Sequence, residues 1–314
     1  MLKIRPFVQG SDEEIYVRIF NVSFGDYEDI RYMTLDEMLK MEKSPMFSAD
    51  GLFIAEQDGK TAGMVDAYVD KQRGDQKGFI QSLAVLPEFG RNGIGRKLVV
   101  KAVESLKQRG MKVADTWAQS DREGCVSLFE SLGFKVIRVT SLMERSLAHV
   151  TIDGGVNEQI LIRKAQLRDE NEILLLNKLD NEAFKEHFNY RPRTIDETKY
   201  SLLETPWWKE QQAWFAILDN EPVGYVVVGI DADLNKMKNV RYGWILDIGV
   251  LKPMRRRGIG SSLLWHSMKW LKCRGLDNAL LYVDDMNPAG AIRLYEEVGF
   301  EVSKKNFIYQ LRLT

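Results

Sequence analysis

The stretch RRRGIGSSLL, Arg255–Leu264, sets three arginines against two glycines and then begins an apolar helix. Upstream, GRNGIGRKLV at Gly90–Val99 repeats its centre. In each place a short apolar run, IGV at 248–250 or LAV at 83–85, precedes the turn and is predicted to be a strand. A glycine turn between a strand and a helix presents unpaired amides at the positive end of the helix dipole. We therefore expect it to hold a group with several negative charges, such as a pyrophosphate.

Other interpretations of this turn place different demands on its neighbours. The plainest is a solvated basic loop whose glycines serve only the turn. A dinucleotide-binding motif needs a third glycine where the chain has Leu98 and Leu263. A P-loop needs Lys and then Ser or Thr after its glycines, whereas Arg96 and Lys97 follow in the first copy. Because both copies keep the strand, a proline, the GIG triplet and the helix, phosphate binding without nucleotide hydrolysis is favoured.

The repeated landmarks indicate a tandem duplication. The GIG triplets at Gly93 and Gly258 lie 165 positions apart, and the motifs SLGF and EVGF end at Phe134 and Phe300, 166 positions apart. A unit of this size is a domain rather than a short structural repeat. The Gly-rich segment TIDGGVNE falls between the copies. The predicted division is an N-terminal domain at 1–150, a linker at 151–157 and a C-terminal domain at 158–314.

Each copy is predicted to be α+β, with a mostly antiparallel sheet flanked by helices. In the second copy, residues 169–184 form an amphipathic helix, and a capping box at Thr194–Glu197 begins another. The run YGWILDIGV at 242–250 is apolar enough to be a central strand. The helix that starts at Ile259 carries its apolar residues on one face.

The composition excludes several classes of protein. Among 314 residues, 44 are basic and 45 acidic, so no general attraction to nucleic acid or to an anionic membrane is expected. The two cysteines, Cys125 and Cys273, fit a reduced compartment, and no long apolar run is present. We expect a soluble cytoplasmic protein. His149, His187 and His266 are too scattered for a metal site, so no metal is expected.

Two motifs together carry a family resemblance. In the second copy a strand is followed by a proline and then by the element R-x-x-G-x-G at Arg255–Gly260, and NPAGAIRLYEEVGF follows at Asn287–Phe300. In this order they resemble the GNAT acetyltransferase superfamily, duplicated in tandem, most strongly over Trp244–Phe300. The layout is similar to that of mycothiol synthases, and the C-terminal half also resembles ribosomal-protein alanine N-acetyltransferases. The resemblance implies acetyl transfer from acetyl-CoA to a small-molecule amine or to the N-terminal amine of a peptide or protein. Whether the protein is a monomer or a homodimer stays open.

The resemblance also implies contacts with coenzyme A in each half. The strand backbone would pair with the pantetheine, and the turn would hold the pyrophosphate. In the C-terminal half these residues are Ile248, Gly249, Val250, Arg255, Arg256, Arg257, Gly258, Ile259, Gly260, Ser261 and Asn287. Their N-terminal counterparts are Leu83, Ala84, Val85, Arg91, Asn92, Gly93, Ile94, Gly95 and Arg96. An amide near Ile248 or Val250 would stabilise the oxyanion. The side chain of Asn287 has an alternative role as a helix N-cap alone.

Tyr295 matches the tyrosine that serves as general acid in the family. The corresponding residue of the first copy is Phe129, which fills the same space but donates no proton. Packing alone is therefore the alternative role for Tyr295. Because Gly90 replaces Arg255 as well, we expect the N-terminal half to bind coenzyme A weakly or to act as a scaffold, and the C-terminal half to be catalytic.

The general base cannot be assigned from the motifs. The strand glutamate of many family members is matched by Trp244, which takes no proton. Asp247 lies on the same strand among apolar residues, where burial would raise its pKa toward that of a useful base. A structural hydrogen bond is the alternative for Asp247, and Asp284 and Asp285 are further candidates. The missing base also leaves a second function open, a regulatory or scaffold protein that binds acyl-CoA without turnover.

Overall fold

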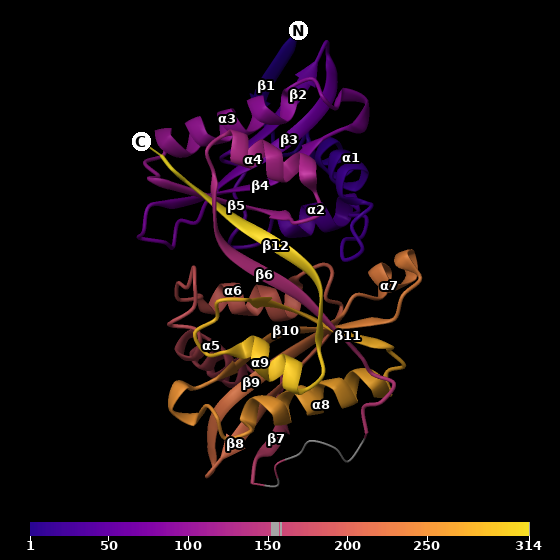
Figure 1. Cartoon of the computed structure of the whole chain (residues 1–314), viewed down its shortest axis with the longest axis vertical. Coiled ribbons are helices and arrows are strands. Elements are labelled where there is room, and N and C mark those ends of the chain that lie inside the picture. The colour runs from indigo at the N-terminus through magenta and orange to yellow at the C-terminus, as the bar shows by residue number, and fades with distance from the viewer. Residues whose placement is uncertain (152–156, 158, 314) are drawn as a thin grey trace. The chain divides into compact units, whose positions relative to one another are not determined.

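The computed structural model describes residues 1–151, 157 and 159–313, and it divides into two compact units (Figure 1). Unit 1 consists of Met1–Val139 and Asn306–Thr314, and unit 2 of Thr140–Lys305. These boundaries differ from the expected division at 150 and 158, because residues 140–150 belong to unit 2 and the last nine residues to unit 1. Most of the expected linker, residues 152–156, lies outside the described residues.

The sheet of unit 1 has the strand order β1-β2-β3-β4-β5-β12. Neighbouring strands are antiparallel except for β4 and β5, which are parallel. The strands are β1 (Leu2–Pro6), β2 (Leu52–Gln57), β3 (Lys60–Val69), β4 (Lys77–Val85), β5 (Val113–Gln119) and the C-terminal part of β12 (Glu301–Arg312). The helices are α1 (Glu13–Phe24), α2 (Leu35–Met41), α3 (Ile94–Gln108) and α4 (Glu123–Ser131).

Unit 2 repeats this plan in the order β6-β11-β10-β9-β8-β7. Among the described residues, β10 and β11 pair in parallel and the other neighbouring strands pair antiparallel. The strands are β7 (Leu161–Lys164), β8 (Glu210–Leu218), β9 (Glu221–Ile230), β10 (Tyr242–Val250), β11 (Asn278–Asp284) and the C-terminal part of β6 (Lys135–Ser146). The helices are α5 (Glu170–Ala183), α6 (Ile195–Lys199), α7 (Ala232–Lys238), α8 (Ile259–Cys273) and α9 (Ala291–Glu297). The mixed sheet flanked by helices confirms the predicted fold class.

Each unit takes one strand from the other half of the sequence. In unit 1, β5 pairs antiparallel with Asn306–Arg312 of β12, the last strand of the chain. In unit 2, β11 pairs antiparallel with Thr140–Ser146 of β6, which follows the first copy's helix α4. The strands β6 and β12 hold equivalent places in the duplicated sequence. The two copies have therefore exchanged their final strands.

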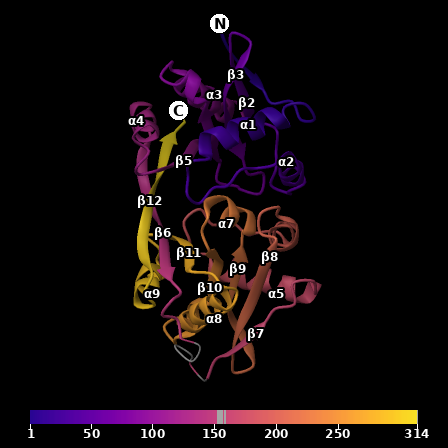
Figure 2. The same ribbon diagram turned by 90° about the vertical axis from the view of Figure 1, so that its right-hand side faces the viewer.

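Alternate residues of β8 and β9 face opposite layers of unit 2. Trp214 and Val226 pack in the core under α8, whereas Phe215 and Tyr225 pack under α5. Figure 2 shows α5 and α8 on opposite sides of these strands. The α8 face predicted from the sequence is the buried one, and each member is at most 1% exposed: Ile259, Leu263, Leu264, Met268 and Leu271. The predicted capping box of α6, Thr194 with Glu197, is also confirmed.

The helix cap expected at Asn287 is wrong. Helix α9 begins at Ala291, after Gly290 with a φ of +68°. The Oδ1 atom of Asn287 instead accepts a hydrogen bond from the amide of Ala289 at 2.8 Å. Asn287 therefore closes a turn before the helix, since the left-handed Gly290 delays the first helical residue. Among the described residues, no helix has both the length and the apolar character needed to cross a bilayer.

Candidate active site

A cavity of about 490 Å³ opens between two central strands of unit 2. Parallel pairing joins β10 to β11 only over Tyr242–Trp244 and Asn278–Leu280. Beyond that point Ile245–Val250 and Leu281–Asp284 line opposite sides of the cavity. The edge of β10 that faces β11 is consequently open in this region, and its backbone groups are accessible to an extended ligand. The size is typical of a small-molecule site.

The glycine turn forms one end of this cavity and adopts the same backbone in both units. Arg256 and Gly258 have φ values of +63° and +78°, and their counterparts Arg91 and Gly93 have +64° and +72°. The first hydrogen bond of α8 runs from the amide of Ser262 to the carbonyl of Gly258. The amides that precede Ser262 in the first turn of the helix therefore have no partner within it. This geometry suits an anion at the start of α8.

The arginines of the turn have different surroundings. Arg255 lines the cavity, but its guanidinium donates to the carbonyls of Val250 at 3.0 Å and Ala183 at 2.8 Å. It thereby joins the end of β10 to α5. Arg256 and Arg257 are exposed, and neither forms an ion pair with any residue that the structure describes. Their charges are consequently free to meet an anionic ligand, and Arg256 lines the cavity.

The remaining coenzyme positions named from the sequence fall into two groups. Ile248, Gly249, Ile259, Gly260, Ser261 and Asn287 also line the cavity of unit 2. In unit 1, Leu83, Ala84 and Val85 end β4, which is paired to β5 only as far as Phe79 and Asp115. Ile94 and Gly95 begin α3. The side chain of Asn92 donates to the carbonyl of Phe89 at 3.3 Å, and Arg96 donates to Ser131 at 2.6 Å.

A β-bulge places Asp247 on the α5 side of the sheet. Pairing of β10 with β9 shifts register between Ile245 and Asp247, so Leu246 is the additional residue. Ile245 packs in the core under α8, as Ile248 does after the bulge. The shift lets both Leu246 and Asp247 lie away from α8. Without it, Asp247 would share a face with Ile245, because side chains alternate along a strand.

The carboxylate of Asp247 lies in a polar pocket beside the cavity. Its Oδ2 is 3.7 Å from a guanidinium nitrogen of Arg193, and Asp180 on α5 lies nearby. The Asp247 side chain is 19% exposed and lines the cavity, so a substrate can reach it. Burial, followed by the negative charge of Asp180, raises the pKa of Asp247 to about 7, although Arg193 acts to lower it.

Tyr295 faces the same cavity from α9. Its hydroxyl has no hydrogen-bond partner among the residues that the structure describes. Burial and the neighbouring Asp247 raise the pKa of the Tyr295 phenol, which therefore keeps its proton at neutral pH. Its counterpart Phe129 is 1% exposed and belongs to the core of unit 1.

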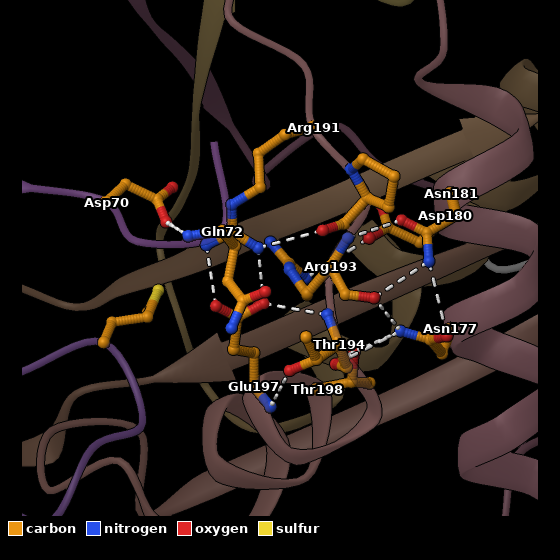
Figure 3. Close-up of polar contacts among 12 residues, drawn as sticks. Asp70, Gln72, Asn177, Asp180, Asn181, Arg191, Arg193, Thr194, Glu197 and Thr198 are labelled. Atoms are coloured by element: carbon orange, nitrogen blue, oxygen red, sulfur yellow. Dashed lines mark hydrogen bonds and ion pairs between the residues drawn. The ribbon is translucent and has the colours of Figure 1, made fainter. Parts of the chain in front are cut away.

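The region between α5 and α6 shapes the side of the site near Asp247. The Asn181 side chain donates to the carbonyl of Arg193 at 3.0 Å and accepts from its amide at 2.7 Å (Figure 3). Arg191 donates to both carboxylate oxygens of Glu197, the capping-box residue of α6. His187 lines the cavity with its ring centroid 4.3 Å from that of Phe184. Burial, and to a lesser degree Arg255, lowers the pKa of His187, so its ring is neutral at pH 7.

Sequence reasoning missed Asp180, Arg193 and Tyr225, which surround Asp247. Each comes from a different segment, so no local motif contains them. A signal is present, because the capping boxes at Thr34–Glu37 and Thr194–Glu197 align the two copies of this region. In that alignment, Asp180 and Arg193 correspond to apolar residues of the first copy. No group of three or more His, Cys, Asp or Glu side chains suited to a metal ion occurs among residues 1–151, 157 and 159–313.

The fold and the sequence together define the class of this protein. The profile of the acetyltransferase (GNAT) family matches residues 14–134 and again residues 176–300. The chain therefore belongs to the GNAT acetyltransferase family and carries two copies of its domain in tandem. This confirms the enzyme class that the sequence motifs indicated.

Several relatives with detectable sequence similarity are named mycothiol acetyltransferase. The protein of that name from Actinosynnema mirum is 28% identical over 280 residues, which cover 88% of each chain. The mycothiol acetyltransferase of Thermobispora bispora is 29% identical over 219 residues, covering 69% of this chain and 71% of its own. Both matches are longer than a single copy of the domain.

Solved structures share the fold over the whole chain. A tandem GNAT protein from the clavulanic acid biosynthesis pathway superimposes with a TM-score of 0.75 and 15% identity, covering 100% of this chain and 99% of its own. A GCN5-related N-acetyltransferase from Sphaerobacter thermophilus gives a TM-score of 0.71 and 20% identity, with coverages of 99% and 96%. At these identities the likeness establishes the tandem fold alone.

Proposed function

We propose that the protein transfers the acetyl group of acetyl-CoA to an amine and that the reaction takes place in unit 2. One observation carries this assignment: a carboxylate, Asp247, and a protonated phenol, Tyr295, line one cavity together with an open strand edge and a phosphate-type turn. In unit 1 the corresponding residues are Ser82 and Phe129, which supply neither a base nor an acid. We therefore assign unit 1 a non-catalytic role.

The cavity of unit 2 suits acetyl-CoA as the donor. The free edge of β10 offers backbone groups for the amide-containing pantetheine arm. The unpaired amides at the start of α8, with the charges of Arg256 and Arg257, suit the diphosphate. In this arrangement Arg255 fixes the position of the turn through Val250 and Ala183. The thioester of the bound donor supplies the activated acetyl group.

The residues on either side of the cavity divide the proton transfers. The acceptor arrives as an ammonium ion, and Asp247, with a pKa of about 7, takes a proton to give the neutral amine. The amine nitrogen then forms a bond to the acetyl carbon, and the carbon–sulfur bond breaks. An amide of Ile248 or Val250 stabilises the charge that develops on the carbonyl oxygen. Tyr295 donates its proton to the departing sulfur. The second proton lost from the nitrogen as the amide forms restores the Tyr295 phenol, and Asp247 releases its proton to water.

The acceptor is proposed to be a small-molecule amine. The relatives matched over more than two thirds of this chain are named mycothiol acetyltransferases, and these enzymes are named for a small molecule rather than a protein. The cavity of about 490 Å³ is also of a size that holds the reactive end of both a coenzyme and a small acceptor. A peptide N-terminus remains the second class of acceptor to be compared.

The test is a panel of amines offered to the full chain with acetyl-CoA, with release of free thiol as the measurement. Small primary amines and peptides with free N-termini form the two arms. We expect at least one small amine to release thiol and the Asp247→Asn variant to lose most of this activity while still binding acetyl-CoA by calorimetry. Binding without thiol release from any amine would instead identify an acyl-CoA-binding protein without turnover.

A further inference from the structure

Four polar side chains form a partly buried cluster next to the cavity of unit 2. The phenol of Tyr225 on β9 donates a hydrogen bond to Oδ1 of Asp180 on α5 at 2.7 Å. A guanidinium nitrogen of Arg193 lies 3.5 Å from Oδ2 of Asp180 and 3.7 Å from Oδ2 of Asp247. Arg193 therefore bridges the two carboxylates, and Figure 3 shows it beside Asp180. Of the two, only Asp247 lines the cavity.

The inner part of the cluster is buried, so its charges are weakly screened there. Tyr225 is 0% exposed and Asp180 is 6% exposed, whereas the side chains of Asp247 and Arg193 are 19% and 39% exposed. Two carboxylates against one guanidinium leave an excess negative charge when both are ionised, and a buried site disfavours that charge. One proton held by the pair removes it. Because Asp180 has the guanidinium and the phenol as partners, Asp247 is the carboxylate better placed to take up and release that proton.

Unit 1 has the same scaffold with apolar residues at the three matching positions. Asn21 bonds to the backbone of Met33 as Asn181 bonds to that of Arg193, with an accepted bond of 2.7 Å in both units. By these matching bonds, Phe20 is the counterpart of Asp180, and Met33 is the counterpart of Arg193. Met64 is the counterpart of Tyr225, because the preceding residues occupy equivalent strand pairings: Gly63 pairs with Val85, and Gly224 pairs with Val250. The three partners of Asp247 therefore have apolar counterparts in unit 1, where Ser82 takes the place of Asp247.

We propose that Asp180, Tyr225 and Arg193 are positioning residues that hold Asp247 toward the cavity and set its basicity. This assignment rests on the proposed function, in which Asp247 deprotonates the acceptor. Asp180 raises the proton affinity of Asp247 through its charge, and Arg193 limits the rise by facing both carboxylates. Tyr225 fixes the orientation of Asp180 through its hydrogen bond. The residues act on the base and not on the substrate.

Other charged and titratable groups face Asp247 or its partners from the surrounding elements. Tyr295 faces it from α9, and the backbone amide of Ile248 lies next to it on β10. Asp284 lines the same cavity from β11. Glu197 acts on Arg193 from α6, although Arg191 pairs with that carboxylate directly. A substitution at Asp180 or Arg193 leaves all of these in place, so its effect on the base can be isolated.

The test is the pH dependence of kcat/KM in the full chain with the acceptor found in the amine panel. Asp180→Asn removes a negative charge near Asp247 and leaves Arg193 to face Asp247 alone. The pKa of Asp247 should therefore fall, and the acidic limb of the profile should move to lower pH by about one unit. Arg193→Met introduces the residue found at the matching position of unit 1, Met33, and should move the acidic limb to higher pH. Asp231→Asn is the matched control, since Asp231 is a buried carboxylate that caps α7. The acidic limb of this variant should lie at the same pH as in the native protein.

Opposite shifts from two substitutions in one cluster cannot arise from general destabilisation. If both variants keep the acidic limb of the native protein, or move it in the same direction, the positioning role is overturned. Asp180→Glu, which restores the charge, should return the limb toward its native position.

A second measurement separates this inference from the proposed reaction. The carboxyl carbon of Asp247 can be titrated by NMR in the full chain labelled at aspartate, with Asp247→Asn to identify its signal. Downward and upward shifts in Asp180→Asn and Arg193→Met support the cluster even if no acceptor is acetylated, and the proposed function alone would then fail. Turnover with an unshifted titration of Asp247 would overturn the inference and leave the reaction standing.

Discussion

Tyr295 meets Phe300 edge to face, with ring centroids 6.1 Å apart, and unit 1 repeats the contact between Phe129 and Phe134 at 5.5 Å. The aromatic ring therefore has a packing role in both copies, and the hydroxyl is what distinguishes unit 2. Removing that hydroxyl should test chemistry without removing the packing.

Tyr295→Phe should lower kcat at least tenfold, because the departing thiolate loses its proton donor. The melting temperature should change little, since phenylalanine already fills this position in unit 1. Affinity for acetyl-CoA should also be kept, as calorimetry would show. Tyr309→Phe, at a buried tyrosine of unit 1, is the control and should keep full turnover. Native kcat in Tyr295→Phe would exclude the phenol from the mechanism.

The pH profile of the native protein should show an acidic limb near pH 7. Asp247 must be ionised to accept a proton, and burial raises its pKa to about 7. Activity should therefore rise as the pH increases through that value. The phenol of Tyr295, whose pKa is raised, stays protonated well into the alkaline range, so no limb from this group is expected near neutrality. Asp247→Asn should remove the acidic limb from whatever activity is left, and its persistence there would assign the limb to another group.

The exchanged strands predict an unequal effect of a C-terminal deletion. Removing residues 306–314 takes away the partner of β5, together with the fully buried Tyr309. Losing one such buried side chain costs roughly 1.5–3 kcal/mol, before the lost strand pairing is counted. Hydrogen exchange at Val113–Gln119 of unit 1 should accelerate far more than exchange at Asn278–Asp284, whose partner is β6. Equal acceleration in the two strands would contradict this assignment of partners.

The sequence predicts the features that depend on local patterns. The apolar face of α8, the capping box at Thr194 and the glycine turn at Gly258 each reside in one short stretch, so spacing and residue type reveal them. The strand exchange is not local, because β6 and β12 have equivalent patterns and nothing in either selects its partner. The surroundings of Asp247 come from three segments far apart in the chain, and they become visible only when the two copies are aligned.

The glycine turn allows the two units to be compared with one matched pair of substitutions. Gly258 and Gly93 have φ values of +78° and +72°, and a Cβ atom at either position would meet no atom closer than 3.7 Å. Alanine at these positions therefore introduces backbone strain without a clash, about 1–2 kcal/mol in each case. Gly258→Ala should raise the KM for acetyl-CoA roughly tenfold, since about 1.4 kcal/mol corresponds to that factor. Gly93→Ala should lose a similar amount of thermal stability and keep the native KM, because unit 1 takes no part in the reaction. A KM raised equally by Gly93→Ala would show that coenzyme binding in unit 1 contributes to turnover.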